Sequence, residues 1–212
     1  MPKRKGLFIT FEGCEGCGKS TQAGLLYDEM VRRNILAVLT HEPGGTPLGD
    51  RIRKILKVKR DFNIGPQTEL LLFAACRSQL IKDVILPALA GGANVICDRF
   101  SGSTLAYQGY GRGLDLDLIK SINNAATGGL QPDLIFLLDL KPESGLGRKH
   151  NTADDRFEAE DIAFHRRVRD GYLELAGRDP GRWIVLEAQQ PSGELGKDIF
   201  NRVRPLLNKA AS

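Results

Sequence analysis

The segment 13–20 constrains this chain more than any other, because its sequence Gly-Cys-Glu-Gly-Cys-Gly-Lys-Ser fits the pattern G-x-x-x-x-G-K-S/T at every fixed position. An apolar run at residues 7–11 precedes it, and a helical pattern follows it. Glycines in this context turn successive backbone N–H groups toward one concavity, to which the N-terminus of the next helix adds partial positive charge. The segment therefore predicts a phosphate-binding loop for a nucleotide.

Two side chains of this loop have predicted roles. Lys19 would reach the β- and γ-phosphate oxygens, and the Ser20 hydroxyl would ligate a magnesium ion. A glycine-rich turn without a ligand is the alternative, but the length of the match weighs strongly against it. The residues expected to bind the nucleotide here are Gly13, Cys14, Glu15, Gly16, Cys17, Gly18, Lys19, Ser20 and Thr21.

The composition favours one globular domain spanning residues 1–212, because 42% of the residues are hydrophobic and 26% are charged. No apolar run approaches the ~18 residues of a membrane helix, and the basic start Met1–Lys5 lacks the cleavage site of a secretory signal. The net charge of +4 is scattered along the chain. We therefore expect a cytoplasmic protein that binds small anions rather than nucleic acid or a membrane.

Cysteine and histidine spacing predicts no metal site. A C-x-x-C pair lies in the phosphate loop, but no second pair or nearby histidine completes it, so we expect unpaired thiols. The cysteines are Cys14, Cys17, Cys76 and Cys97. The histidines, which we expect at the surface or in turns, are His41, His150 and His165.

Apolar runs alternate with helical patterns along the chain. Strands are predicted near residues 7–11, 35–40, 93–97, 134–140 and 183–186, and helices near 19–34, 47–56, 67–85, from 115, 157–177 and 192–207. We expect Pro87 and Pro205 to kink or end their helices. Strands without polar alternation suit a doubly wound parallel sheet with helices on both faces, whose ligands bind beyond the carboxyl ends of the strands.

Three polar segments each follow a predicted strand directly, so we expect them to form one site: the phosphate loop, residues 42–46, and Asp98-Arg99. Asp98 would hold magnesium directly or through water, and Arg99 would bind a second phosphate. A solvated strand-end carboxylate is the alternative for Asp98. Glu15 would be repelled by a triphosphate, so we expect it to face the second substrate, unless it is a variable loop position without a role.

The segment 142–155 is rich in Gly, Lys, Arg, His and Asn and poor in apolar residues, which predicts a mobile flap. Arg148, Lys149 and Arg156 are candidates to supply positive charge to the phosphates when the flap closes. A solvated surface role is the alternative for each.

Several separated motifs resemble those of bacterial thymidylate kinases over nearly the whole chain. They are Phe11-Glu12-Gly13, the phosphate loop with its internal acid, Glu42-Pro43-Gly44-Gly45-Thr46, Leu72-Phe73-Ala74-Ala75-Cys76-Arg77, Asp98-Arg99-Phe100, Ala106-Tyr107-Gln108-Gly109 and Asp155-Arg156-Phe157-Glu158. The resemblance implies transfer of the ATP γ-phosphoryl group to dTMP, for dTTP synthesis. It also implies a P-loop NTPase fold with five parallel strands, a flexible lid near residues 142–156, magnesium as cofactor and a homodimer.

The resemblance also implies residue roles in substrate binding. Phe73 would stack on thymine, Arg77 would bind its carbonyl edge, and Arg99 would hold the dTMP phosphate. Tyr107 would pack where a ribose 2′-hydroxyl would otherwise fit. The substrate-binding residues so implied are Glu15, Glu42, Pro43, Phe73, Arg77, Arg99, Thr104, Tyr107 and Gln108.

The loop has no arginine, so the chain is similar to family members that carry cationic catalysis in the lid, which implies Arg148 and Arg156 as catalytic residues beside Lys19 and Arg99. Gln189 and Gln190 fall where the family contacts adenine. Two positions depart from the family pattern: Cys76 and Gly102 replace acidic residues. Our hypothesis is that Arg77 takes its support from somewhere other than position 76.

Three alternative functions compete with this interpretation. Another nucleoside monophosphate kinase, or a deoxynucleoside kinase, would differ only in the base pocket. A nucleotide-dependent switch protein of the GTPase type would need D-x-x-G and N-K-x-D, and neither occurs in the sequence. A nucleotide-binding protein without catalysis is disfavoured by Lys19, Ser20, Asp98 and Arg99.

Overall fold

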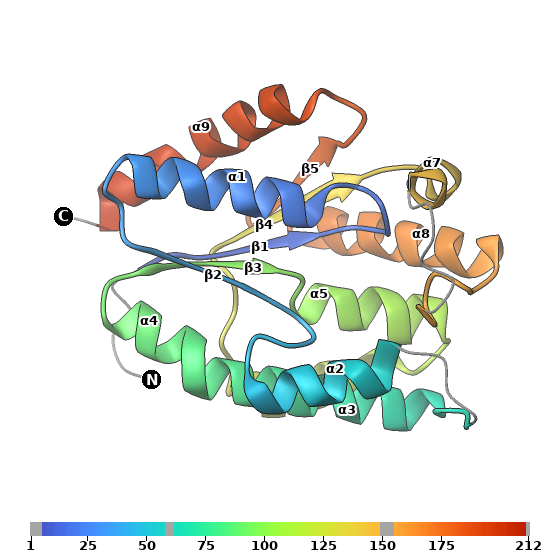
Figure 1. The fold of residues 1–212 in the computed structure, drawn as a ribbon. Helices are drawn as coiled ribbons and strands as arrows, with labels where there is room; N and C mark the ends of the chain where they lie inside the picture. Colours follow the sequence, from blue (N-terminus) through green and yellow to red (C-terminus); the bar gives the residue numbers. More distant parts are fainter. Residues whose placement is uncertain (1–5, 58–61, 149–154, 211–212) are drawn as a thin grey trace.

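The computed structural model describes residues 6–57, 62–148 and 155–210. As predicted, five parallel strands form one sheet, and their order in it is β2-β3-β1-β4-β5 (Figure 1). They are β1 (Phe8–Glu12), β2 (Ala37–His41), β3 (Asn94–Asp98), β4 (Leu134–Asp139) and β5 (Trp183–Glu187). Strands that follow one another in the chain are joined by helices, since parallel strands need crossover connections.

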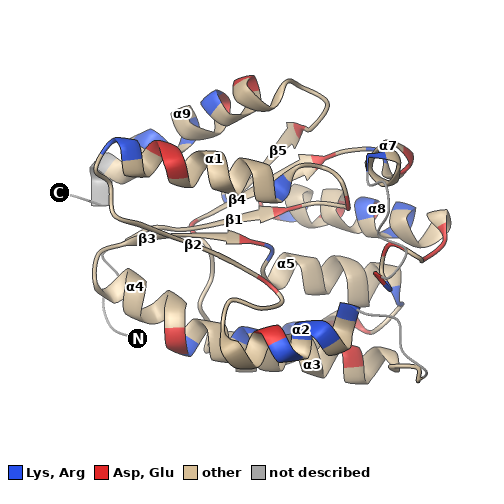
Figure 2. Ribbon diagram, viewed as in Figure 1, with Lys and Arg blue, Asp and Glu red and all other residues tan. Residues whose placement is uncertain are grey.

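The helices cover both faces of the sheet (Figure 1). Their bounds are α1 (Lys19–Arg32), α2 (Pro47–Lys57), α3 (Pro66–Leu80), η1 (Ile81–Ile85), α4 (Leu86–Ala90), α5 (Ser101–Thr104), η2 (Leu105–Gly111), α6 (Leu116–Thr127), α7 (Pro142–Gly147), α8 (Ile162–Arg178) and α9 (Ser192–Ala210). The turns η1 and η2 are π-helical. Figure 2 shows both acidic and basic residues on α8, whereas the charged residues of α2 are mainly basic.

Alternate strand residues face opposite layers of the core, as the two-residue period of a strand requires. Ile9 and Phe11 pack in the cluster that includes residues of α1 and α9. Phe8 and Val95 pack in the cluster that includes residues of η1 and α4. A third cluster joins η2 and α8 beneath the end of the sheet, with Tyr107 among its members. This third cluster positions the residues of the candidate site.

Neither proline ends its helix, and one predicted helix start was wrong. Helical structure continues past Pro87, which follows the π-helical turn η1 and lies in α4, a helix that runs to Ala90. Pro205 lies inside α9, which runs to Ala210, so of the two expected effects of these prolines only a kink stays a prediction. The helix predicted from Phe157 begins at Ile162, where the side chain of Asp161 accepts a hydrogen bond from the Phe164 N–H at 2.6 Å.

The segment predicted as a flap contains the short helix α7, and its residues Lys149 and His150 lie outside the described ranges. A lid near residues 142–156 and a single domain over residues 1–212 stay predictions. None of the described helices combines the length and apolar composition that crossing a bilayer requires.

Candidate active site

The carboxyl ends of β1, β2 and β3 meet at one point. Phe11 and His41 are both register partners of Asp98, and the Glu42 N–H donates to the Asp98 carbonyl at 2.9 Å. The three polar segments that follow these strands therefore lie together, as predicted. They line a cavity of about 720 Å³, here called the phosphate cavity, whose wall includes Glu15, Gly16, Gly18, Lys19, Ser20, Thr21, Glu42, Asp98, Arg99 and Arg148.

The phosphate loop has the backbone that its glycines predict. Gly13, Gly16 and Gly18 have φ values of 138°, 69° and 92°, in the region that favours glycine. A Cβ atom at Gly16 would lie 2.0 Å from the Gly145 carbonyl oxygen, so α7 packs directly on the loop. Gly13, Cys14 and Cys17 lie behind the cavity wall rather than in it.

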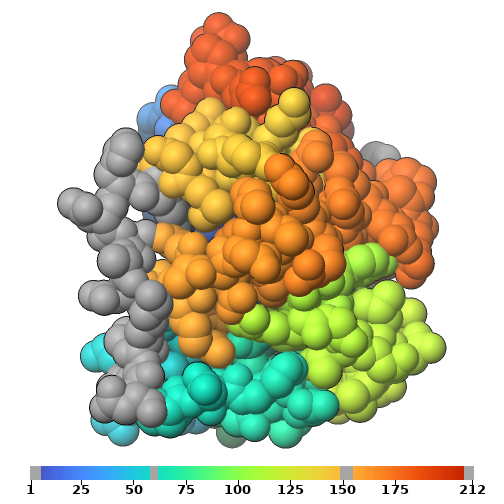
Figure 3. Space-filling model, turned by 90° about the vertical axis from the view of Figure 1, so that its right-hand side faces the viewer, coloured from blue at the N-terminus to red at the C-terminus, as the bar shows by residue number. Residues whose placement is uncertain are grey.

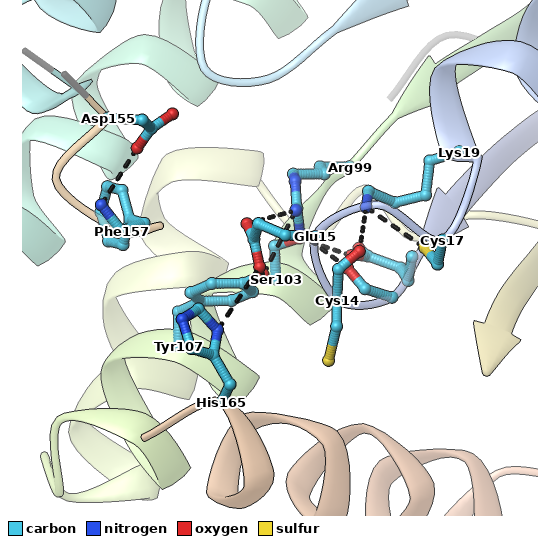
Figure 4. A network of polar contacts seen from close by, with 12 residues as sticks. Cys14, Glu15, Cys17, Lys19, Arg99, Ser103, Tyr107, Asp155, Phe157 and His165 are labelled. Atoms are coloured by element: carbon cyan, nitrogen blue, oxygen red, sulfur yellow. Dashed lines mark hydrogen bonds and ion pairs between the residues drawn. The ribbon is translucent and has the colours of Figure 1, made fainter. Parts of the chain in front are cut away.

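Lys19 is buried and folds back over the loop. Its Nζ donates to the Cys14 carbonyl at 2.6 Å and lies 3.4 Å from the Cys17 sulfur (Figure 4). Burial raises the pKa of the Cys14 thiol to about 12, and all four cysteines are free. Cys14 and Cys17 both pack in hydrophobic clusters, and the described residues contain no group of three or more His, Cys, Asp or Glu side chains that could hold a metal ion.

Ser20 and Asp98 have the oxygen chemistry that magnesium prefers. The Ser20 hydroxyl donates to Asp98 Oδ2, and Asp98 Oδ1 is buried with no hydrogen-bond partner in the described part of the chain. Mg²⁺ is usually bound by one or two carboxylates together with substrate phosphates and water, rather than by a cage of protein groups. One hydroxyl and one half-satisfied carboxylate beside a phosphate loop fit that requirement.

Arg99 lies on the boundary between the phosphate cavity and a smaller pocket. Its φ of 73° turns it out of β3. The guanidinium donates to the Gly13 carbonyl at 3.0 Å, to Glu15 at 3.0 Å and to the Tyr107 hydroxyl at 3.2 Å (Figure 4). It also donates to Ser103 and to the Tyr172 hydroxyl, both at 3.2 Å. Because these hydrogen bonds hold the guanidinium in place, Arg99 presents fixed positive charge to both the phosphate cavity and the smaller pocket.

Buried Glu12 holds the groups that surround Arg99. Its carboxylate accepts from Ser103 at 2.6 Å, from Tyr172 at 3.1 Å and from the Phe100 N–H at 2.9 Å. Burial raises the pKa of Glu12, although these hydrogen bonds and the Arg99 charge oppose the shift. A Cβ at Gly102 would lie 2.9 Å from both Glu12 Oε1 and Trp183, so a side chain at this position would require one of these groups to shift.

Glu15 lines the smaller pocket as well as the phosphate cavity, and the expectation that it faces the second substrate stays a prediction. Its oxygens accept from Arg99 and Tyr107, and His165 Nδ1 lies 3.8 Å from Oε2 (Figure 4). Burial by itself would raise its pKa, but the charges of Arg99 and Lys19 and the Tyr107 hydrogen bond outweigh burial and lower it to about 2. Glu15 is therefore ionised at neutral pH. His165 is buried, so its predicted surface position was wrong.

The smaller pocket, here called the aromatic pocket, gathers the residues implied for base binding. The rings of Phe73 and Tyr107 each lie 5.9 Å from the ring of Phe157. The polar part of the wall includes Glu15, Glu42, Arg77, Arg99, Thr104 and Gln108, and Pro43 completes it. A flat apolar ligand with polar edges fits such a wall.

Arg77 takes its support from Glu42 and Asn123, as the hypothesis about position 76 requires. Nε and Nη2 donate to the Glu42 carboxylate at 2.9 and 2.7 Å, and Nη1 donates to Asn123 at 2.6 Å. Nη2 also donates to Thr104 at 2.8 Å. The Cys76 thiol points elsewhere, toward the Gly49 carbonyl at 3.7 Å. Arg77 is thus held by a bidentate ion pair with Glu42, and no acidic residue at position 76 is needed to support it.

The two arginines predicted for the lid lie in different places. Arg148 lines the phosphate cavity, and its Nη1 donates to the carbonyls of Gly16 and Ala188 at 3.4 Å. Arg156 does not line it, because its side chain binds Glu69 and the Leu56 carbonyl. Gln189 and Gln190 are exposed residues that follow Ala188 and are not part of the described cavity wall.

Sequence reasoning missed two cations of the phosphate cavity, Arg53 and Lys57. Arg53 donates to the Pro43 carbonyl at 2.7 Å, and Lys57 binds Asp155 at 2.8 Å. Both lie on α2, one turn apart, where charged residues look like a solvated helix face. Their four-residue spacing on a helix that follows a site loop was the available signal.

Comparison with known proteins agrees with this geometry. The family model described as thymidylate kinase matches residues 11–199. A thymidylate kinase of Dehalococcoides mccartyi is 54% identical over 201 residues, covering 95% of this chain and 97% of that protein. One of Trichlorobacter lovleyi is 46% identical, covering 93% and 96%.

A solved structure is also similar. The crystal structure of thymidylate kinase from Ehrlichia chaffeensis superposes with a TM-score of 0.78 at 33% sequence identity, covering 94% of this chain and 98% of that one. Sequence and structure agree over nearly the whole length. The chain belongs to the thymidylate kinase family.

Proposed function

We propose that this chain transfers the γ-phosphoryl group of ATP to dTMP, giving dTDP and ADP in the synthesis of dTTP, with the residues assigned below. The observation that carries the proposal is the shared wall between the two spaces. Glu15 and Arg99 line both the phosphate cavity and the aromatic pocket. A donor bound in one and an acceptor bound in the other would meet at Arg99, which suits a transfer between them.

In the phosphate cavity, the loop N–H groups and Lys19 would bind the ATP phosphates. Ser20 and Asp98 would hold magnesium, which when bound neutralises charge on the β- and γ-phosphates. Phosphoryl transfer spreads negative charge over equatorial oxygens, and fixed cations stabilise that charge because they need no reorganisation during the reaction. Lys19, Arg99 and Arg148 are placed to do this, with Arg148 reaching the loop from the end of α7.

In the aromatic pocket, Phe73 would stack on thymine, and Arg77, Thr104 and Gln108 would bind its polar edge. Tyr107 would pack beneath the sugar and Glu15 would face the 3′-hydroxyl side. The hydrogen bond from the Tyr107 hydroxyl to Glu15 supports this assignment, because it holds the ring in the pocket wall. Arg156 would have to leave Glu69 and the Leu56 carbonyl, which hold its side chain, in order to reach the phosphates as a catalytic residue. Gln189 and Gln190 remain candidates for adenine contacts.

ADP release measured with dTMP, dUMP, UMP, CMP, GMP and thymidine as acceptors tests the function. We expect the highest kcat/KM with dTMP and little turnover with thymidine, which brings no phosphate to Arg99. UMP is expected to react poorly because its 2′-hydroxyl would meet Tyr107. Activity on UMP equal to that on dTMP would contradict the role of Tyr107, and activity only on a purine nucleotide would contradict the function.

We also propose a homodimer and a cytoplasmic location. Apolar side chains are exposed on three helices that pack side by side, namely Leu48 and Ile55 on α2, Leu71 on α3 and Leu118 on α6. Burying such a surface against a second copy is favourable. Light scattering, which measures mass in solution, should give twice the chain mass, and a monomer would contradict the dimer. The four free thiols suit a reducing compartment.

A further inference from the structure

Glu69 on α3 is fully buried and is not itself part of either cavity wall, yet it lies at the centre of a polar cluster. Its Oε1 accepts from Gln108 Nε2 at 2.8 Å and from Arg112 Nε at 3.2 Å. Its Oε2 accepts from Arg112 Nη2 at 3.4 Å and from Arg156 Nη2. The chain that follows residue 155 lies against α3 at this point (Figure 3). Glu69 therefore connects a residue of the aromatic pocket with two guanidinium groups.

The contact fixes which end of the Gln108 amide enters the aromatic pocket. A carboxylate accepts hydrogen bonds and cannot donate them, so the NH₂ group of Gln108 must face Glu69. Its carbonyl oxygen then faces the other way, and no described residue donates to it. Arg77 lines the same wall, and one of the two N–H groups of its Nη1 is used by Asn123. The wall thus presents a donor from Arg77 and an acceptor from Gln108.

We infer that Glu69 is a positioning residue that makes the aromatic pocket selective for an imide base, by holding the Gln108 carbonyl toward the base. A donor beside an acceptor is complementary to the 4-carbonyl and N3–H of thymine or uracil. It is mismatched at both atoms with the amino group and bare N3 of cytosine. This inference rests on the proposed function, because it concerns how the same pocket chooses its nucleobase.

Replacing Glu69 by glutamine should turn the Gln108 amide over. Each oxygen position meets one Arg112 nitrogen, at 3.2 Å for Oε1 and 3.4 Å for Oε2, but only the Oε2 position also meets the Arg156 guanidinium, so it favours the carbonyl oxygen of the new side chain. The Oε1 position then receives the NH₂ group, which donates to Gln108 and draws its carbonyl away from the pocket. Gln108 would present its own NH₂ group to the base, opposite the N3–H of thymine. Two hydrogen-bond donors would then face each other, so the Gln108 NH₂ group and the thymine N3–H would both be buried without an acceptor.

The experiment compares wild type with Glu69→Gln, using kcat/KM for dTMP and dUMP and the inhibition constant of dCMP. We expect kcat/KM for both imide nucleotides to fall about tenfold to hundredfold, mainly through KM, which is the usual range for one lost buried hydrogen bond. The inhibition constant of dCMP should stay the same or decrease. An equal loss of affinity for dTMP and dCMP would overturn the inference.

Two further variants separate orientation from general damage. In a Gln108→Leu background the amide is gone, so adding Glu69→Gln should no longer change the ratio of dTMP to dCMP affinity. Arg112→Met removes other Glu69 contacts but leaves the Gln108 amide bonded to the carboxylate, so the ratio should match wild type. A ratio that shifts in either case would show that Glu69 does not act through Gln108.

A measurement on wild type keeps the inference testable even when Glu69→Gln does not fold. In the dTMP complex the N3–H proton should appear in the NMR spectrum, protected from exchange by its hydrogen bond to Gln108, and should disappear in Gln108→Leu. An unprotected proton in wild type would overturn the inference. Wild type that does not phosphorylate dTMP would instead refute the proposed function, so the two failures can be told apart.

Discussion

Lys19→Ala should lower kcat about 10²- to 10³-fold while the protein stays folded, since this is the usual cost of removing one preorganised group that stabilises transition-state charge. Lys19 is the only lysine of the phosphate loop, and its Nζ lies beside the loop backbone, where it donates to the Cys14 carbonyl. The Gly16 N–H, the Arg99 charge and Ser20 remain, so residual catalysis is expected. KM for dTMP should change little, because Lys19 is not part of the aromatic pocket wall.

Steady-state kinetics and circular dichroism test this prediction together. Lys197→Ala is the matched control, because it makes the same chemical change at an exposed position of α9 that lines neither the phosphate cavity nor the aromatic pocket. It should keep both the fold and the wild-type kcat. A folded Lys19→Ala protein with wild-type kcat would contradict the role of this lysine, and a loss confined to KM for ATP would show that it contributes only to binding.

Much of the site was predictable because it depends on local sequence. The phosphate loop is recognised by glycines at fixed positions, and each strand end is recognised by polar residues that follow an apolar run. Each of these patterns is contained within a few consecutive residues. The rule that ligands bind beyond the carboxyl ends of parallel strands then places Asp98 and Glu42 beside the loop. These inferences need no knowledge of which distant residues touch each other. They need only the expectation that the strands form one parallel sheet.

Other parts could not be predicted because they depend on tertiary packing. The segment 101–111 is rich in serine and glycine and was not predicted as a helix, yet it forms α5 and η2. A Cβ at Gly109 would lie 2.5 Å from Leu116, and one at Gly111 would lie 2.6 Å from Phe164, so the glycines allow close packing rather than a turn. The sequence pattern predicts that Phe157 begins a helix, but in the structure Phe157 precedes α8 and its ring forms part of the aromatic pocket wall.

The partners of the buried charges were equally hidden in the sequence. The hydrogen bonds of Arg77 join residues 35 and 46 positions apart, and those of Arg156 and Glu69 join residues 87 positions apart. No local pattern encodes such pairs. These distant pairs nonetheless hold polar side chains of the aromatic pocket wall, because Arg77 donates to Glu42 and Asn123, and Gln108 donates to Glu69.

Arg77→Met should destabilise the protein by about 3–5 kcal/mol, the usual cost of breaking a buried ion pair by removing one partner. The two side chains are 1% and 3% exposed, so the Glu42 carboxylate would be left without water or a cation. Replacing both residues, as Arg77→Met with Glu42→Gln, should recover much of that loss because no buried charge remains. Urea unfolding at pH 7 measures the three free energies.

The matched control is Arg166→Met, which breaks an arginine–glutamate pair whose side chains are 62% and 48% exposed. Its expected cost is at most about 1 kcal/mol, because water solvates both charges after the pair is broken. An equal cost for Arg77→Met and Arg166→Met would contradict the structural role of the Arg77–Glu42 pair. No recovery in the double variant would show that Arg77 stabilises the fold through packing rather than charge.

The penalty of Arg77→Met should also depend on pH. Burial raises the pKa of the Glu42 carboxyl, and the Arg77 charge opposes that shift, so removing Arg77 raises the pKa further. A carboxyl whose pKa is higher in the folded than in the unfolded protein binds more protons when folded, and stability then falls as pH rises through that window. The difference in unfolding free energy between wild type and Arg77→Met should therefore shrink as the pH is lowered from 8 to 5. A difference that stays constant over this range would show that Glu42 is not the group left unpaired.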